Sequence, residues 1–228
     1  AQFLLSESGS DAPVDLKTIS PVSLATLKTE FPSLLTDENL LHNLDLHLAS
    51  AEQFGAAVIQ IDELAAKPDP DGLMITLLHQ AEALCAEKNA IHGLLDRCRL
   101  ALAVPELNAG DTLVLAEQLQ SQFAEKTGAS ATAGAAQFPT LAYERREIMD
   151  NARKALVHAE FFGPGSRAAF DSVSLNISGD QYYQQGEIEQ AMKEFNLALA
   201  LDPENVNVYN SLGVCHGING DFDQALEA

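Results

Sequence analysis

The stretch "LNISGDQYYQQGEIEQAMKEFNLALALDPEN" at residues 175–205 decides the fold of the C-terminal quarter of the chain. Several of its residues recur in the same class or identity 34 positions later. Such self-similarity at a fixed period is the signature of stacked structural repeats, so the sequence predicts helical hairpins over 172–228. The aligned pairs are Leu175 with Tyr209, Asn176 with Asn210, Gly179 with Gly213, Gly186 with Gly220 and Ala191 with Ala225.

The spacing within one repeat has a mechanical meaning. Small residues at Gly179 and Ala191 allow two helices to cross closely, and Phe195 and Leu199 can fill the seam between them. Pro203 should end the second helix, because the residue before a proline avoids the α region of backbone conformation. Each repeat is therefore expected to be a pair of helices with a close crossing.

These small, aromatic, alanine and proline positions resemble the tetratricopeptide repeat (TPR) over residues 172–228. One departure is Ser178, where that family favours the leucine that the second copy keeps as Leu212. Because such repeats usually need about three units to bury a continuous core, we expect the natural protein to continue past residue 228. The resemblance implies a concave peptide-binding face formed by the first helix of each repeat. Four residues are expected to line this repeat groove: Asn176, Asp180, Tyr183 and Asn210.

The charge of the chain limits its partners. It carries 33 acidic and 13 basic residues, a formal net charge of −20 at pH 7, and residues 172–228 hold nine acids against the single base Lys193. Such a charge repels phosphate backbones and anionic lipid head groups, so we expect neither a nucleic-acid nor a membrane partner. No apolar run approaches the roughly 20 residues of a membrane span. A protein or peptide partner of basic character fits best.

Cysteine and histidine usage predicts no metal site and no cofactor. The cysteines Cys85, Cys98 and Cys215 are widely spaced and form no CxxC pair, which argues against a disulfide framework or structural zinc and favours a cytoplasmic protein. His42 and His47 do not share a helical face well. The aspartates of "KPDPDG" at residues 67–72 belong to a turn that is too short for a calcium loop of about 12 residues.

The first 171 residues alternate strands with helices. A polar linker at 6–13 precedes a short helix that starts with the cap-like pair Ser20-Pro21, so residues 1–33 are interpreted as an N-terminal linker and helix. Beyond it the pattern predicts an α+β domain at 34–171, with a sheet covered by helices. The expected helices lie at 34–54, 73–88, 109–128 and 144–161, and the expected strands at 55–64, 99–105, 129–139 and 166–173.

Three local strings in this order resemble the GGDEF domain of bacterial diguanylate cyclases, which has a cyclase-like palm fold. "SATAGAAQFP" at 130–139 is similar to that family's Thr-x-Ser-x-Gly-x-Ala-x-x-Pro strand. "NARKALVHAEFFGPGSRAAF" at 151–170 resembles its last helix and closing strand, and "VIQIDEL" at 58–64 resembles its first strand. The predicted architecture is therefore a GGDEF-like palm domain followed by an all-α TPR solenoid.

The resemblance implies that the Gly-Gly-Asp-Glu-Phe hairpin falls on Asp96–Leu100, "DRCRL", which retains none of those five residues. Glycines let the backbone approach a nucleotide, and the acids help to hold magnesium. The first metal aspartate corresponds to Gln60, although the second acid survives as Asp62. We interpret six residues as a vestigial nucleotide site, the palm site: Gln60, Asp62, Asp96, Arg97, Cys98 and Arg99.

Other positions implied by the resemblance also differ. The phosphate-binding lysine falls near Ala65 or Ala66, and the guanine-recognising asparagine and aspartate fall near Pro68 and Leu77. Neither Pro68 nor Leu77 can make the required hydrogen bonds. The family's inhibitory product site falls on two residues without its Arg-x-x-Asp pattern, Glu87 and Ala90.

The leading hypothesis is a non-catalytic signalling or scaffold protein that binds a protein partner through its repeats. An alternative is an enzyme or sensor of GTP or cyclic di-GMP that uses Arg97, Arg99 and Asp62 in a rearranged site. A third is that the N-terminal domain only caps the repeat stack. Cys98 between two arginines could be a reactive thiol, or a small residue in an altered hairpin; the arginines could bind an anion, or pair with nearby acids.

Overall fold

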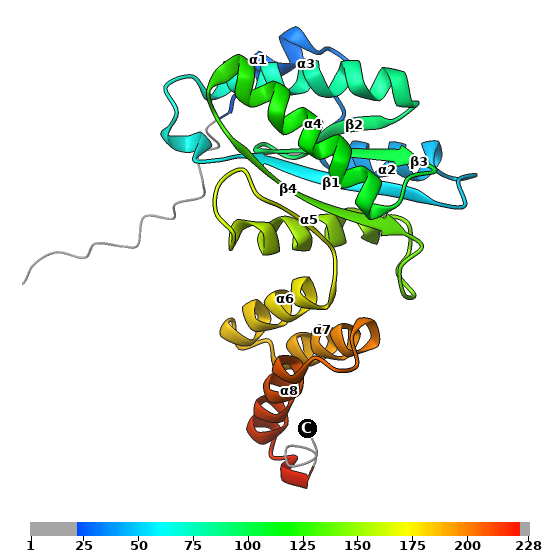
Figure 1. The fold of residues 1–228 in the computed structure, drawn as a ribbon, viewed down its shortest axis with the longest axis vertical. Coiled ribbons are helices and arrows are strands. Elements are labelled where there is room, and N and C mark those ends of the chain that lie inside the picture. The colour runs from blue at the N-terminus through cyan, green and yellow to red at the C-terminus, as the bar shows by residue number, and fades with distance from the viewer. Residues whose placement is uncertain (1–21, 224–228) are drawn as a thin grey trace, which may run out of the picture.

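The computed structural model describes residues 22–223 (Figure 1). The predicted linker at 6–13, the pair Ser20-Pro21 and Ala225 of the second repeat lie outside the described residues. The helices are α1 (Leu24–Glu30), α2 (Asp37–His47), α3 (Pro70–Lys88), α4 (Ala109–Thr127), α5 (Glu147–Glu160), α6 (Ser172–Gln184), α7 (Ile188–Leu201) and α8 (Val206–Asn219). The strands are β1 (Phe54–Ile61), β2 (Ile91–Asp96), β3 (Arg99–Pro105), β4 (Ala131–Phe138) and β5 (Arg167–Ala169).

The five strands form one sheet in the order β2-β3-β1-β4-β5. Its pairs are antiparallel except for β4 and β5, which are parallel. The central strand β1 pairs with β3 so that Gln60 lies opposite Arg99, which places the two segments side by side. The hairpin between β2 and β3 turns at Arg97 and Cys98.

Helices cover both faces of the sheet, which is why β1 carries no polar side chain from Phe54 to Ile59. Side chains alternate along a strand, so Ala57 and Ile59 join the core under α1, α3 and α4. Ala56 and Val58 join the second core, with α2 and α5. Figure 1 shows α3 and α4 on one side of the sheet and α5 on the other.

Helix α5 lies unusually close to β4, because Gly134 has no side chain. A Cβ built at Gly134 would lie 1.9 Å from the backbone nitrogen of Leu156 and 2.3 Å from the carbonyl oxygen of Ala152. Backbone atoms of a helix cannot move aside as a flexible side chain can. Only glycine at this position therefore permits α5 to pack as close to the sheet as it does.

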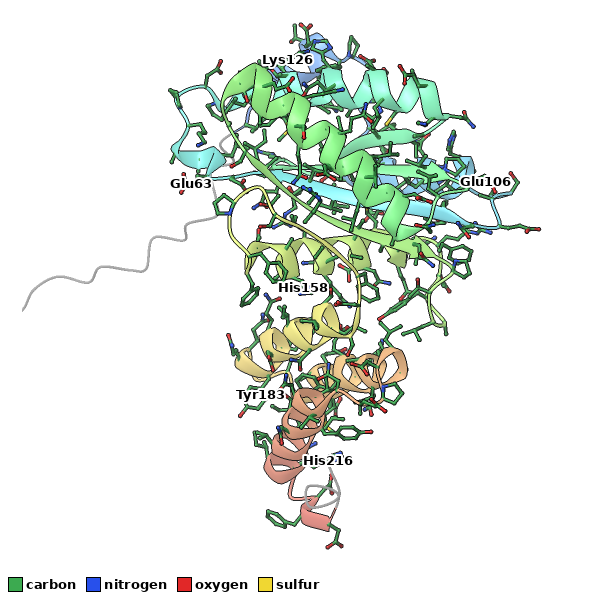
Figure 2. All side chains as sticks on the ribbon, in the orientation of Figure 1. Glu63, Glu106, Lys126, His158, Tyr183 and His216 are labelled. Carbon is green, nitrogen blue, oxygen red and sulfur yellow. The ribbon has the colours of Figure 1, made fainter. Side chains whose placement is uncertain are left out.

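The opposite side of α5 carries polar residues that contact the repeat helices. Lys154 donates from Nζ to both carboxylate oxygens of Glu194 on α7, each at 2.8 Å, and both residues are buried. Nδ1 of His158 lies 3.2 Å from Oγ of Ser174 on α6. Figure 2 shows His158 on the side of α5 that faces α6. The sheet domain and the repeats therefore share a packed junction.

The repeat helices follow the predicted mechanics. A Cβ at Gly179 would lie 2.4 Å from the ring of Phe195, so this glycine allows α6 and α7 to cross closely. Helix α7 ends at Leu201, one residue before Asp202-Pro203. The side chain of Asn205 then caps α8 by accepting from the backbone N–H of Val208.

Three local predictions need correction, and one strand was missed. The strand expected at 166–173 ends at Ala169, because Asp171 and Ser174 form a capping box that starts α6 at Ser172. The helix expected at 34–54 is shorter and comprises only α2. The first helix, α1, is capped by Ser23 and not by the pair Ser20-Pro21, because the side chain of Ser23 accepts from the backbone N–H of Thr26. Strand β2 was not predicted, because this mostly half-buried strand at the edge of the sheet has no apolar alternation.

The first testable prediction concerns the close approach at Gly134. Gly134→Ala should lower the free energy of unfolding by about 3 kcal/mol or more, because the methyl group meets helix backbone. The matched control is Gly217→Ala on α8, where a Cβ meets nothing within 4 Å. It should be neutral or stabilising by up to about 1 kcal/mol. Urea denaturation measures both, and equal stability of Gly134→Ala and the parent would contradict the packing argument.

The second prediction concerns the buried ion pair. Lys154→Met should destabilise the protein by about 3 to 5 kcal/mol, because it leaves the Glu194 carboxylate buried without its cation. The double variant Lys154→Met with Glu194→Met should recover most of that loss. Arg146→Met removes the exposed pair with Asp45 and should change stability by less than about 1 kcal/mol. Thermal unfolding tests the set, and additive losses in the double variant would refute the coupling.

Candidate functional site

The palm site joins three of its six side chains by hydrogen bonds between side chains. Arg99 donates from Nε to Oε1 of Gln60 and from Nη1 to Oδ2 of Asp96, each at 3.0 Å. Gln60 in turn donates to Oε1 of Glu160 at the end of α5, also at 3.0 Å. The pairing of β1 with β3 creates this chain, because it sets Gln60 opposite Arg99.

Asp62 makes different contacts. Its Oδ1 accepts from the hydroxyl of Thr132 at 2.7 Å, and its Oδ2 accepts from the backbone N–H of Gly165 at 2.8 Å. Both carboxylate oxygens are thus used to join the end of β1 to β4 and to the loop before β5. In this position Asp62 holds the fold together.

The remaining palm-site residues sit in the hairpin turn. Arg97 is exposed. Cys98 is half-buried, its side chain packs against the core beneath α3 and α4, and its backbone N–H donates to Oδ1 of Asp96 at 2.9 Å. His92, near Cys98 in sequence, lies on β2, and burial lowers the pKa of its imidazole.

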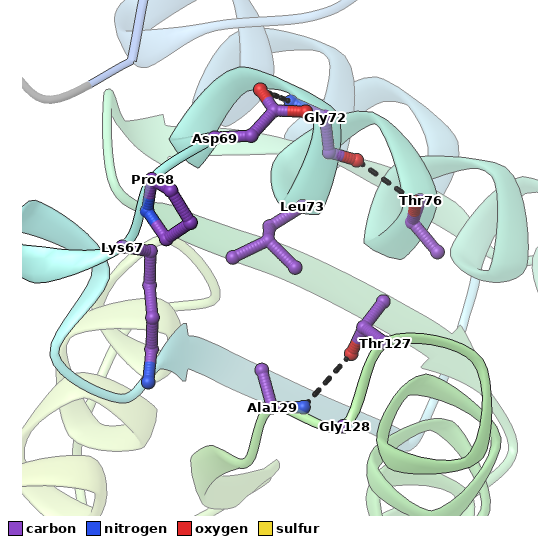
Figure 3. Close-up of a pocket in the computed structure, with 9 residues that line it drawn as sticks. All are labelled: Lys67, Pro68, Asp69, Gly72, Leu73, Thr76, Thr127, Gly128 and Ala129. Atoms are coloured by element: carbon purple, nitrogen blue, oxygen red, sulfur yellow. Dashed lines mark hydrogen bonds between the residues drawn. The ribbon is translucent and has the colours of Figure 1, made fainter.

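A pocket of about 510 Å³ opens at the start of α3 (Figure 3). Three of its polar side chains make local hydrogen bonds. Asp69 accepts from the backbone of Gly72, the hydroxyl of Thr76 donates to the Gly72 carbonyl, and the hydroxyl of Thr127 accepts from the backbone of Ala129. In Figure 3, Leu73 points into the middle of the space between these groups. Pro68 lines this pocket, whereas Leu77 is fully buried in the core.

The repeat helices form a second pocket, of about 270 Å³. We call it the repeat pocket, and its lining residues come from α6, α7 and α8: Asp180, Tyr183, Phe195, Ser211 and Val214. Burial raises the pKa of the Asp180 carboxyl, and a hydrogen bond with Ser211 partly offsets that rise. Burial also raises the pKa of the Cys215 thiol, and the negative charge of Asp180 adds to the effect.

Two of the four predicted groove residues, Asp180 and Tyr183, line the repeat pocket. Asn176 and Asn210 do not line it: Asn210 is exposed, and Oδ1 of Asn176 is buried without a hydrogen bond to any described residue. Ser211 and Val214 were missed. The repeat period could have found Val214, because it stands 34 residues after Asp180.

Comparisons with known proteins match these two parts separately. The family model of the TPR repeat matches residues 179–220. The GGDEF domain of DgcB from Caulobacter crescentus, solved with c-di-GMP, aligns with a TM-score of 0.53 and 16% identity over 60% of this chain and 88% of that one. A comparison with curated protein sequences gives no match.

Two further solved structures resemble the sheet domain. The GGDEF domain of YfiN (TpbB) from Pseudomonas aeruginosa gives a TM-score of 0.54 and 19% identity over 61% of this chain and 98% of that one. The active GGEEF domain of a diguanylate cyclase from Vibrio cholerae gives 0.51 and 16% over 60% and 97%. The chain therefore combines a GGDEF-domain fold with a TPR repeat.

Two absences hold for the described part of the chain. Between residues 22 and 223, no helix combines the length and the apolar character needed to cross a membrane. Over the same range, no group of three or more histidine, cysteine, aspartate or glutamate side chains is arranged to hold a metal ion.

The third prediction concerns the cost of placing Asp180 in the repeat pocket. Because its folded-state pKa is raised, the ionised carboxylate is less favourable in the folded protein than in the unfolded chain. Asp180→Asn should therefore raise the unfolding temperature at neutral pH. The gain should shrink as the pH falls through the raised pKa, and vanish below about pH 4.

Thermal unfolding at stepped pH measures this effect. The control is Glu189→Gln, which removes one negative charge from an exposed position of α7 outside the repeat pocket. The difference between the unfolding temperatures of the two variants separates the effect of the pocket from the effect of removing one negative charge from an acidic chain. A neutral-pH loss of stability in Asp180→Asn would identify the carboxylate as a structural group instead.

Proposed function

We propose that this chain is a non-catalytic signalling or scaffold protein. In this proposal the repeat helices bind a protein partner, and the GGDEF-like domain does not carry out cyclase chemistry. The observation that carries the proposal is the contact of Arg99 with Asp96 and Gln60 in the palm site.

The guanidinium of Arg99 stands where the resemblance expects hard oxygen ligands for magnesium. A fixed positive charge repels a divalent cation, and Arg99 already neutralises the nearest acid, Asp96. Phosphoryl transfer depends on metal ions that neutralise triphosphate charge. The palm site is therefore poorly suited to bind a metal-nucleotide complex.

The other positions of the family's site support the same proposal. Asp62 uses both oxygens for contacts within the fold, so a metal ion would compete with the bonds to Thr132 and Gly165. Leu77, at the guanine-recognising aspartate position, is fully buried and has no polar side-chain atom. Pro68 offers neither a side-chain donor nor an acceptor.

The repeat helices have the features of a binding surface. They present the repeat pocket together with exposed apolar residues on α8, among them Val214 and Ile218. The same segment carries nine acids and one base. A pocket that combines apolar walls with the Asp180 carboxylate, in a segment with an excess of acids, suits a basic protein segment.

The fourth prediction tests the loss of nucleotide chemistry. Isothermal calorimetry of the 228-residue chain with GTP and magnesium, and separately with cyclic di-GMP, should detect no binding tighter than about 1 mM. Incubation with GTP should yield no cyclic di-GMP. The active GGEEF domain from Vibrio cholerae serves as the positive control.

The two ligands separate the alternatives. Magnesium-dependent GTP binding, or any turnover, would overturn the non-catalytic proposal. Binding of cyclic di-GMP alone would support a sensor instead. If that binding weakened in Arg97→Ala and not in Arg153→Ala, which removes an arginine paired with Asp150 on α5, it would locate the sensor site at the hairpin.

A further inference from the structure

The repeat pocket holds one carboxylate among apolar and aromatic walls. Asp180 and Tyr183 come from α6, Phe195 from α7, and Ser211 and Val214 from α8. The first helices of two successive repeats and the helix between them thus converge on Asp180. Figure 2 shows the position of Tyr183 on this part of the molecule.

The carboxylate of Asp180 has no cationic neighbour to neutralise it. Among the described residues it forms no ion pair, in contrast to Glu194, which is bound by Lys154. The lone base of the segment, Lys193, is exposed on α7 and does not line the pocket. A partly buried acid without a counter-ion favours the arrival of a positive charge.

The volume of the repeat pocket limits the size of the cationic group that can enter it. At about 270 Å³ it is smaller than the usual range of roughly 300 to 1,000 Å³ for small-molecule sites. It suits one long side chain. The walls formed by Phe195 and Val214 can pack against methylene groups, and the ring of Tyr183 can lie against a cation.

We propose that the repeat pocket binds one lysine or arginine side chain from a basic segment of the partner. The charged head pairs with Asp180, which Ser211 orients, and the aliphatic stem packs on Phe195 and Val214. This inference rests on the proposed function, because it identifies the side chain that the repeat helices recognise. It also gives a role to Asp180, an acid whose charge is partly desolvated.

Four labelled peptides test the proposal against the full chain. All share a short alanine and glutamine backbone with blocked ends, and the central residue is lysine, acetyl-lysine, norleucine or glutamate. Fluorescence anisotropy should give the tightest binding for lysine. Loss of the charge in acetyl-lysine or norleucine should weaken binding by about tenfold, and glutamate should abolish it. A fifth peptide, with arginine at the centre, should behave like the lysine peptide.

Three variants locate the binding. Asp180→Asn should weaken the lysine peptide by about tenfold and leave the norleucine peptide unchanged. Val214→Phe keeps the carboxylate but fills the pocket at an exposed position, so it should weaken both peptides. Glu189→Gln, the matched loss of one charge outside the pocket, should leave both affinities within about twofold. Circular dichroism confirms that each variant is folded.

Several outcomes would overturn the inference. These are equal affinity for lysine and acetyl-lysine, an unaffected Asp180→Asn, equal effects of Asp180→Asn and Glu189→Gln, or no binding of the lysine and arginine peptides at millimolar concentration. Each leaves the calorimetric test of nucleotide binding untouched. Conversely, GTP turnover would overturn the non-catalytic proposal while a charge-selective repeat pocket still stood.

Discussion

The contact between α5 and β4 at Gly134 is the constraint on which the rest of the structure depends. Because a Cβ there would meet helix backbone, the glycine lets α5 lie directly on the sheet. The apolar side of α5 is then buried in the second core, with Ile148, Ala152 and Leu156. Its other side is left facing outward, and this is the side that receives the repeat helices.

The junction on that outward side contains a buried ion pair and is not purely apolar. A buried ion pair brings little net stability, because desolvation of both charges offsets their attraction. Its geometry is nevertheless demanding, since Lys154 reaches both oxygens of Glu194. Tyr143 lies beside the same pair, with its ring 6.0 Å from the Lys154 ammonium. Such a junction fixes the orientation of the repeats on the sheet domain more than it adds stability.

The two candidate sites treat charge in opposite ways. In the palm site, Asp96 and Asp62 are satisfied by contacts within the chain, from Arg99 and from Thr132 and Gly165. In the repeat pocket, Asp180 has only Ser211 to stabilise its charge among the described residues. A site whose charges are neutralised within the chain attracts a charged ligand weakly. A carboxylate without a counter-ion attracts a cationic ligand more strongly. This contrast favours the repeats over the sheet domain as the place where the protein meets its partner.

Local sequence determined much of the repeat. The 34-residue period, the small residues at Gly179 and Ala191 and the stop at Pro203 act within one helical hairpin, so they can be recognised without coordinates. The strings around β1, β4 and α5 likewise placed the sheet domain in the GGDEF-domain fold. Sequence also located the hairpin, because "DRCRL" at residues 96–100 spans the turn between β2 and β3.

Other features depend on residues that only the fold brings together. Lys154 and Glu194 are 40 positions apart, and Asp62 and Gly165 are 103 apart, so nothing in their neighbourhood of sequence predicts their contact. The walls of the repeat pocket also come from three helices. Sequence alone thus determined most of the helices and strands of the described chain, but not β2. Tertiary structure decided which charges are neutralised and which stay open, because that depends on distances between segments remote in the chain.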